Sequence, residues 1–177
     1  MNEKHTLSAK VVKVFGNDIS TDIIYPGTYL YCTDSKKTPA FCFKVNNDEE
    51  FNRQLVSGAI LPGSIIVAGA NFGCGSSREQ AASSIAGHGL VIVAKSFARI
   101  FLDNASRLGI RTVIVPRIEA AEGDTLSIAA TTVRNEQSGK TFSITPHQSY
   151  HQFLIDAGGL VPYAAELLKA SVRGERI

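Results

Sequence analysis

Residues 64–94 read SIIVAGANFGCGSSREQAASSIAGHGLVIVA, and this stretch decides the fold class. A β-rich run over 64–68 leads into a glycine-rich turn, a helix is predicted over 77–86, and a second apolar strand follows over 90–94. The apolar runs are continuous rather than alternating, which is typical of parallel strands buried on both faces. A strand, a helix and a strand in this order predict a parallel pair joined by a right-handed crossover.

The same alternation continues towards the C-terminus. Ser96 is positioned to cap a helix whose apolar residues recur at helical spacing until Gly109 ends it. A third strand is predicted over 111–115 and stops at Pro116. Three strands and two helices in this order predict a parallel βαβαβ core. Upstream, a run rich in β-branched residues over 7–15 predicts a further strand.

The remaining segments add loops, antiparallel strands and helices around this core. The expected elements are a polar loop over 16–27, an exposed stretch over 33–39, an amphipathic helix over 47–57, antiparallel strands over 124–132 and 133–144, a helix that starts at Thr145-Pro146, and a last helix over 161–171. The length fits one domain, so the chain is predicted to be a single α/β domain over 1–177.

The composition excludes several classes of protein. Of 177 residues, 44% are hydrophobic and 19% are charged, so the chain can bury a proper core and is not disordered. The net charge of +2 comes without any run rich in Lys and Arg, so no nucleic-acid partner is expected. No stretch approaches the roughly 18 apolar residues of a membrane span, and the polar start of the chain lacks the apolar segment of a signal peptide. We therefore expect a cytoplasmic protein with no membrane partner.

No metal site within this chain is expected from its Cys and His residues. The cysteines Cys32, Cys42 and Cys74 are widely spaced, and no Cys-x-x-Cys pair occurs, which argues against a zinc knuckle or an iron–sulfur loop. Free thiols in a reducing compartment are expected instead. His147 and His151 stand four residues apart on a predicted helix and can share one face, but no third metal ligand is evident.

The glycine-rich turn over 69–80 carries the sharpest chemical signal. Gly73 and Gly75 permit unusual backbone angles and the close approach of another group. Ser76 or Ser77 is positioned to cap the following helix as part of a capping box. The turn would then present backbone N–H groups at a positive helix end beside hydroxyls and a guanidinium, which suits a carboxylate or a phosphate. The alternative is a tight turn with a good helix cap and no ligand.

Three familiar motifs do not fit this turn. A Walker loop requires a Gly-Lys-Ser/Thr sequence, which does not follow here. Arg78 stands where the dinucleotide-binding fingerprint has its third Gly, and no Gly follows the serine at the spacing of a nucleophile elbow. An anion site on this turn is therefore of another kind.

Three segments together resemble one known family. The segment 73–79, GCGSSRE, is similar to the serine loop of the aconitase superfamily, in its swivelling domain. The similarity extends to 94–101 with Asn104, and to 20–27 near the start of the chain. These segments occur in the right order and span most of the chain. In isopropylmalate isomerases this swivelling domain is a separate small subunit.

The resemblance implies a three-layer β/β/α swivelling domain and a hydro-lyase that dehydrates and rehydrates a small hydroxy di-acid. It also implies a [4Fe-4S] cluster bound by a partner large subunit, in a heterodimer or heterotetramer. Ser76, as an alkoxide, would remove the proton from the carbon next to a carboxylate. Arg78 would bind a substrate carboxylate, and Ser77, Asp22 and Thr21 would lie in the same site. Backbone N–H groups and positive charge beside the serine are what such a base requires.

The segment 29–32 follows the Asp22 loop and is similar to the element that selects the substrate side group in this family. Members that act on an extra carboxylate tend to carry Arg here, whereas this chain has Tyr31 and Cys32. An apolar side group, such as the isopropyl of isopropylmalate, is therefore favoured. The alternative is that the segment is an edge strand packed on the core.

Two other functions stay open at this point. The same chemistry can act on a related acid, such as homoaconitate or 2,3-dimethylmalate. The chain can also be a non-catalytic regulatory module that binds a small anion, which accounts for the glycine-rich turn but not for the three-segment resemblance.

Overall fold

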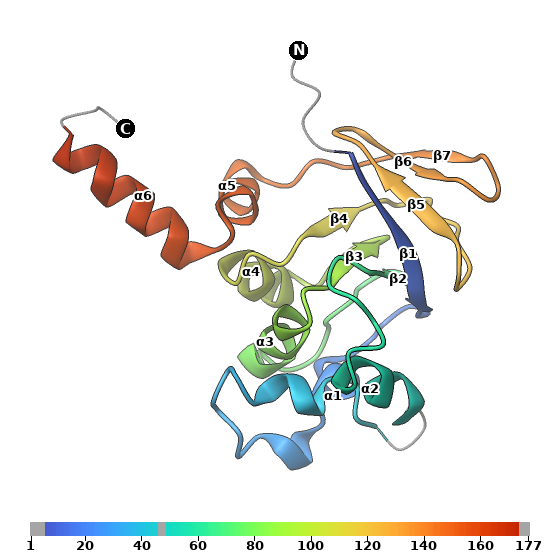
Figure 1. Ribbon diagram of the computed structural model, residues 1–177, viewed down its shortest axis with the longest axis horizontal. Helices are drawn as coiled ribbons and strands as arrows, with labels where there is room; N and C mark the ends of the chain where they lie inside the picture. Colours follow the sequence, from blue (N-terminus) through green and yellow to red (C-terminus); the bar gives the residue numbers. More distant parts are fainter. Residues whose placement is uncertain (1–5, 46–48, 174–177) are drawn as a thin grey trace.

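The structure is a computed structural model that describes residues 6–45 and 49–173. Its centre is one seven-stranded mixed sheet with the strand order β4-β3-β2-β1-β5-β6-β7 (Figure 1). The strands are β1 (Leu7–Val14), β2 (Ile65–Ala68), β3 (Val91–Ala94), β4 (Thr112–Ile114), β5 (Thr125–Ile128), β6 (Thr132–Asn135) and β7 (Thr141–Ser143).

The sheet has a parallel half and an antiparallel half that share β1. Val11 of β1 pairs in parallel with Ile65 of β2, and β2, β3 and β4 continue the parallel half. On the other side, Ala9 of β1 pairs with Leu126 of β5, and β5, β6 and β7 run antiparallel. The predicted parallel core with added antiparallel strands is confirmed, and β1 extends the parallel half to four strands.

The helices lie mainly on one face of the parallel half. Short 3₁₀ turns connect α1 to α2, and α6 extends away from the body of the molecule (Figure 1). No helix in the described ranges has the length and apolar character needed to cross a membrane. The helices are α1 (Thr21–Ile24), η1 (Gly27–Tyr29), η2 (Thr38–Phe41), α2 (Glu49–Val56), α3 (Glu79–Gly87), α4 (Arg99–Arg107), α5 (Ser149–Ala157) and α6 (Leu160–Val172).

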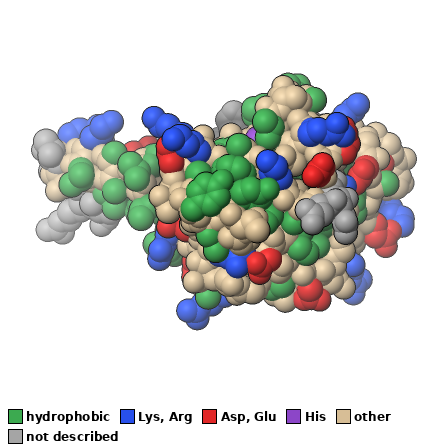
Figure 2. All heavy atoms as spheres, turned by 90° about the horizontal axis from the view of Figure 1, so that it is seen from below, with side chains coloured by type: hydrophobic (Ala, Val, Ile, Leu, Met, Phe, Trp, Pro, Cys, Tyr) green, Lys and Arg blue, Asp and Glu red, His purple; other side chains and the backbone are tan. Residues whose placement is uncertain are grey.

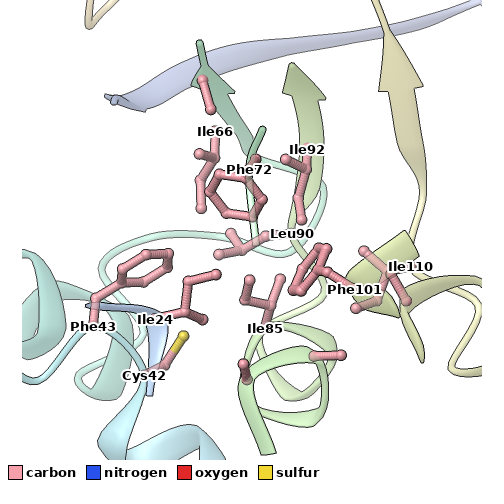
Figure 3. Packing of buried hydrophobic residues seen from close by; sticks show 14 of the residues in the cluster. Ile24, Cys42, Phe43, Ile66, Phe72, Ile85, Leu90, Ile92, Phe101 and Ile110 are labelled. Carbon is pink, nitrogen blue, oxygen red and sulfur yellow. The ribbon is translucent and has the colours of Figure 1, made fainter. Parts of the chain in front are cut away.

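Two hydrophobic clusters divide the molecule into layers. Along β2 the side chains alternate, so that Ile66 faces the helices whereas Ile65 and Val67 face the antiparallel half. The first cluster packs the helices on the parallel strands, with Phe72, Ile85 and other residues from several elements (Figure 3). The second cluster joins the parallel strands to β5 and β6. The two halves of the one sheet pack on each other through the second cluster, and the helices cover the other face of the parallel half. The three layers are therefore the helices, the parallel half and the antiparallel half, which is the predicted β/β/α layering. This explains why β2 and β3 are apolar on both faces.

Two predicted helix starts in the C-terminal two-thirds of the chain are wrong. The helix expected after Ser96 is α4, which begins only at Arg99 and has Ala98 at its N-cap position, with no side-chain cap. The Ser96 hydroxyl instead accepts the backbone N–H of Asn71 at 2.9 Å. The helix expected from Thr145-Pro146 is α5, which begins later, at Ser149. There the N–H of Thr145 donates to a β4 carbonyl at 2.8 Å, which holds the segment along the sheet.

Other predicted boundaries differ by less. The polar loop over 16–27 contains the single turn of α1, with the Ser20 hydroxyl accepting the N–H of Ile23 at 3.4 Å as its N-cap. The helix predicted over 47–57 is α2, and residues 47 and 48 lie outside the described ranges. The last predicted helix, over 161–171, agrees with α6 to within one residue at each end.

Candidate active site

The three motif segments meet at one edge of the sheet. Because β1, β2 and β3 run parallel, the loops that follow them leave the same edge. The N–H of Gly73 in the β2–α3 loop donates to the Ile19 carbonyl in the β1–α1 loop at 2.7 Å. The N–H of Ala98 in the β3–α4 loop donates to the Phe72 carbonyl at 2.9 Å. The β2–α3 loop, which we call the serine loop, is therefore held between the other two.

Two glycines shape the serine loop. Gly73 has φ of 80°, and a Cβ added there would lie 2.2 Å from Cγ of Phe101, so no larger residue fits. Gly75 has φ of 92° and lies beside Thr21, whose hydroxyl oxygen would be 3.5 Å from an added Cβ. The first glycine lets the loop press against α4, and the second turns the chain so that the serines follow at the surface.

The serines lie in a turn before α3 and do not cap it. The N–H of Arg78 donates to the Ser76 carbonyl at 2.8 Å, and the Thr21 hydroxyl donates to the same carbonyl at 3.1 Å. Arg78 is therefore the N-cap position, α3 begins at Glu79, and the predicted serine cap and capping box are wrong. Ser76 and Ser77 are both exposed, and neither hydroxyl has a hydrogen bond to another described residue.

Arg78 and Asp22 form the charged centre of the site. An Nη1–H of Arg78 pairs with Oδ1 of Asp22 and also donates to the Tyr25 carbonyl at 3.2 Å. The Arg78 side chain is 17% exposed and that of Asp22 is 57% exposed, so the pair lies at the mouth of the site. Gly27 lies alongside, and a Cβ there would be 3.7 Å from Nη2 of Arg78. Gly27 and the Tyr25 carbonyl belong to the motif segment 20–27, but the sequence alone predicted no role in the site for either of them.

The aromatic residues beyond Asp22 pack on one another and reach the charged pair through the Tyr25 carbonyl. Tyr25 is buried, its hydroxyl donates to the Tyr29 carbonyl at 3.1 Å, and burial raises the pKa of Tyr25 to about 12. Tyr31 is 77% exposed and meets Phe41 edge-on with 6.4 Å between ring centroids. The segment forms η1 and a turn, so the alternative of an edge strand is wrong. Figure 2 shows apolar side chains gathered in this region of the underside, between charges of both signs.

Tyr31 is not in direct contact with the charged centre. Within the described residues it makes no hydrogen bond or ring contact with Ser76 or Arg78, and its ring contact is with Phe41. Phe41 in turn stacks on Tyr29 at 4.5 Å between ring centroids. The structure therefore brings together Ser76, Ser77, Arg78, Asp22 and Thr21, whereas the only ring contact of Tyr31 among the described residues is with Phe41.

The described residues do not fit a [4Fe-4S] cluster. They contain no group of three or more His, Cys, Asp or Glu residues arranged to hold a metal ion. The cysteines are free and separate, and burial raises the pKa of the Cys42 thiol to about 12, whereas a cluster ligand must be a thiolate. His147 and His151 are engaged elsewhere, since Nε2 of His147 donates to a β4 carbonyl at 2.8 Å and Nε2 of His151 pairs with Asp103 at 2.7 Å.

Comparison with known proteins first defines the class. The aconitase C-terminal domain family matches residues 31–117, a range that contains the serine loop and the β3–α4 loop. The crystal structure of 3-isopropylmalate dehydratase from Methanocaldococcus jannaschii superposes with a TM-score of 0.85 at 34% identity. That match covers 96% of this chain and 99% of the other. The fold is therefore that of an aconitase-type domain.

Comparison with individual proteins gives the family. The 3-isopropylmalate dehydratase small subunit of Moorella thermoacetica is 42% identical over 163 residues, which is 89% of this chain and 95% of that protein. The methanogen homoaconitase small subunit of Methanothermobacter thermautotrophicus is 36% identical over 164 residues, 91% of this chain and 92% of the other. The chain belongs to the small subunits of aconitase-type hydro-lyases. Enzymes of this class use a [4Fe-4S] cluster, and a small subunit implies a large-subunit partner.

Proposed function

We propose that this chain is the small subunit of a 3-isopropylmalate dehydratase. The enzyme would interconvert 2-isopropylmalate and 3-isopropylmalate by dehydration and rehydration, in leucine biosynthesis and in the cytoplasm. The observation that carries the proposal is the exposed Ser76 on a strained glycine-rich loop, next to the Arg78–Asp22 pair. The whole chain would act as one domain.

Each residue of the site has a role in this reaction. Arg78 would bind a substrate carboxylate with the N–H groups of its guanidinium that do not pair with Asp22, because the planar guanidinium can pair with a carboxylate along its edge. Ser76 would take the proton from the carbon next to that carboxylate during dehydration, while the hydroxyl leaves the neighbouring carbon. During rehydration Ser76 would deliver a proton to that neighbouring carbon, and the hydroxyl would add to the first carbon. The Thr21 hydroxyl donates to the Ser76 carbonyl and so helps to hold the backbone of the serine loop at this position. Ser77 would donate a hydrogen bond to the substrate.

The partner would complete the site. Ser76, Ser77 and Asp22 are exposed, and a proton transfer of this kind needs a site from which water is excluded. We assign the [4Fe-4S] cluster to the large subunit, because the cysteines of this chain are buried or isolated. The two subunits would form a heterodimer or heterotetramer, with this chain supplying the base and the carboxylate clamp.

The substrate is assigned from the segment 29–32, which resembles the element that selects the substrate side group. The aromatic side chain at Tyr31 suits an apolar side group, because a third carboxylate would require a cation there. The second candidate is a homoaconitase-type substrate, which the relative from Methanothermobacter thermautotrophicus favours. A regulatory module that binds an anion without catalysis is the third.

Reconstitution separates these candidates. The chain is mixed with a cluster-bearing large subunit, and dehydration to the unsaturated acid is measured on 2-isopropylmalate, homocitrate and 2,3-dimethylmalate. We expect no activity from either subunit alone, and the highest kcat/KM on 2-isopropylmalate for the complex. Equal or faster turnover of homocitrate would contradict the assignment from Tyr31. Tight binding of a small anion by the free chain, with no activity beside any large subunit, would contradict the enzymatic function.

A further inference from the structure

Two residues near the site have an unusual backbone conformation. Asp18 has φ of 56° and Asn71 has φ of 61°. The left-handed region is unfavourable for residues with a Cβ, and Asp and Asn are among those that adopt it most readily. Asp18 follows β1 and Asn71 follows β2, so the two positions lie beyond the ends of adjacent parallel strands. Backbone strain of this kind persists where surrounding contacts enforce it.

The contacts that enforce it join the two loops to each other. Nδ2 of Asn71 donates to Oδ1 of Asp18 at 2.8 Å, and the N–H of Asp18 donates to the Ala70 carbonyl at 2.8 Å. In return, Oδ1 of Asn17 accepts the N–H of Ala70 at 2.8 Å. The N–H of Asn71 donates to the Ser96 hydroxyl at 2.9 Å, which extends the same network to the β3–α4 loop.

We propose that Asp18 and Asn71 are positioning residues for the reaction. Asp18 lies four residues before Asp22, and Asn71 lies five residues before Ser76. The hydrogen bond between their side chains fixes the position of the serine loop relative to the β1–α1 loop. It therefore holds Ser76 in position beside the Asp22–Arg78 pair. Among the described residues, no hydrogen bond or ion pair joins Asp18 or Asn71 to that pair, so the effect passes through the loop backbones. The catalytic part of this inference rests on the proposed function, whereas the ordering of the serine loop does not.

The bond between the two side chains has a definite direction, which allows an exchange experiment. Asn71→Asp places two carboxylates against each other and removes the donor. The double variant Asp18→Asn/Asn71→Asp restores one amide–carboxylate bond with donor and acceptor exchanged, and both residue types tolerate the left-handed backbone. Asn71→Gly removes the bond and accepts the left-handed backbone conformation at lower cost. Asp34→Asn is the matched control, because it changes a carboxylate in a turn outside the three loops, where Oδ1 accepts the N–H of Lys36.

Two measurements are made on each variant. Amide hydrogen exchange on the free chain should be at least about tenfold faster over 72–78 in Asn71→Asp, about threefold faster in Asn71→Gly, and near the starting value in the double variant and the control. In the reconstituted complex, kcat should fall at least about tenfold in Asn71→Asp and recover in the double variant, with KM changed less than about threefold.

Two results would overturn the inference. One is unchanged exchange over 72–78 in both Asn71→Asp and Asn71→Gly. The other is a double variant that keeps the circular dichroism spectrum of the starting protein and yet recovers neither exchange protection nor kcat. If the starting complex is inactive on every acid, the proposed function fails, and the exchange measurement on the free chain still decides whether this pair orders the serine loop.

Discussion

Replacing Gly73 by Ala tests why the serine loop needs glycine at its contact with α4. Gly73 has φ of 80°, and an added Cβ would stand 2.2 Å from Cγ and 2.4 Å from Cβ of Phe101. Phe101 is only 2% exposed and packs edge-on against Phe72, with ring centroids 5.2 Å apart (Figure 3). The ring cannot move aside without disturbing the core, so the loop itself must shift.

The expected cost has two parts. Holding an Ala in the left-handed region costs about 1–2 kcal/mol, and overpacking a filled core costs about 1–3 kcal/mol more. Gly73→Ala should therefore lower the free energy of unfolding by about 2–5 kcal/mol, out of the roughly 5–15 kcal/mol typical of a domain. Gly75→Ala is the matched control, because its φ is 92° but its nearest neighbour, the Thr21 hydroxyl oxygen, would be at an ordinary 3.5 Å. It should cost only about 1–2 kcal/mol.

Urea unfolding of the free chain, followed by circular dichroism, measures both costs. Phe101→Ala in the Gly73→Ala background should reduce the difference between the two glycine variants only in part, because it removes the Cγ contact at 2.2 Å but keeps the Cβ contact at 2.4 Å. If Gly73→Ala costs no more than Gly75→Ala, the serine loop is not pressed against α4, and the reasoning from this contact is wrong.

Three further outcomes are expected. Arg78→Lys should raise KM in the complex at least about tenfold, because an ammonium lacks the planar fork that pairs with a carboxylate while bonded to Asp22; an unchanged KM in initial-rate assays would contradict this. Tyr31→Arg should raise kcat/KM for homocitrate relative to 2-isopropylmalate, and a competition assay that shows no change would remove Tyr31 from specificity. Burial raises the pKa values of Cys42 and Tyr25 from 9.0 and 10.0 to about 12, so the folded chain keeps these protons longer than the unfolded chain does. The free energy of unfolding should fall as pH rises through this range, and Cys42→Ala should flatten the early part of the fall in urea titrations.

The parallel core could be predicted because its signals are local. The runs around Ile66 and Ile92 are apolar on both faces, and glycines end the intervening helix. The starts of α3 and α4 could not, because the turns that precede these helices are held by contacts with neighbouring loops. Ser96 accepts a hydrogen bond from Asn71, and the Ser76 carbonyl is bonded by Thr21 and by the next turn. Helix propensity shows that each serine is suited to the N-cap position. Whether it takes that position depends on the contacts that its turn makes with neighbouring loops.

The site was predicted only as a set of residues. The family resemblance places Asp22 and Arg78 in one site, but their ion pair depends on the order of β1 and β2 in the sheet. The sequence carries no signal for the role of the Tyr25 carbonyl or for the bond between Asp18 and Asn71. Which backbone carbonyl accepts a bond, and which residue is left-handed, is evident only in the folded structure.

The most direct test of Ser76 as the base is the turnover of two neighbouring variants in the reconstituted complex. Ser76→Ala and Ser77→Ala each remove one exposed hydroxyl from the same turn, so their effects on folding and assembly should be alike. We expect Ser76→Ala to lower kcat on 2-isopropylmalate by roughly 10²–10⁴ with KM almost unchanged, and Ser77→Ala to have a smaller effect. Near-normal turnover by a fully assembled Ser76→Ala complex would contradict the assignment of Ser76.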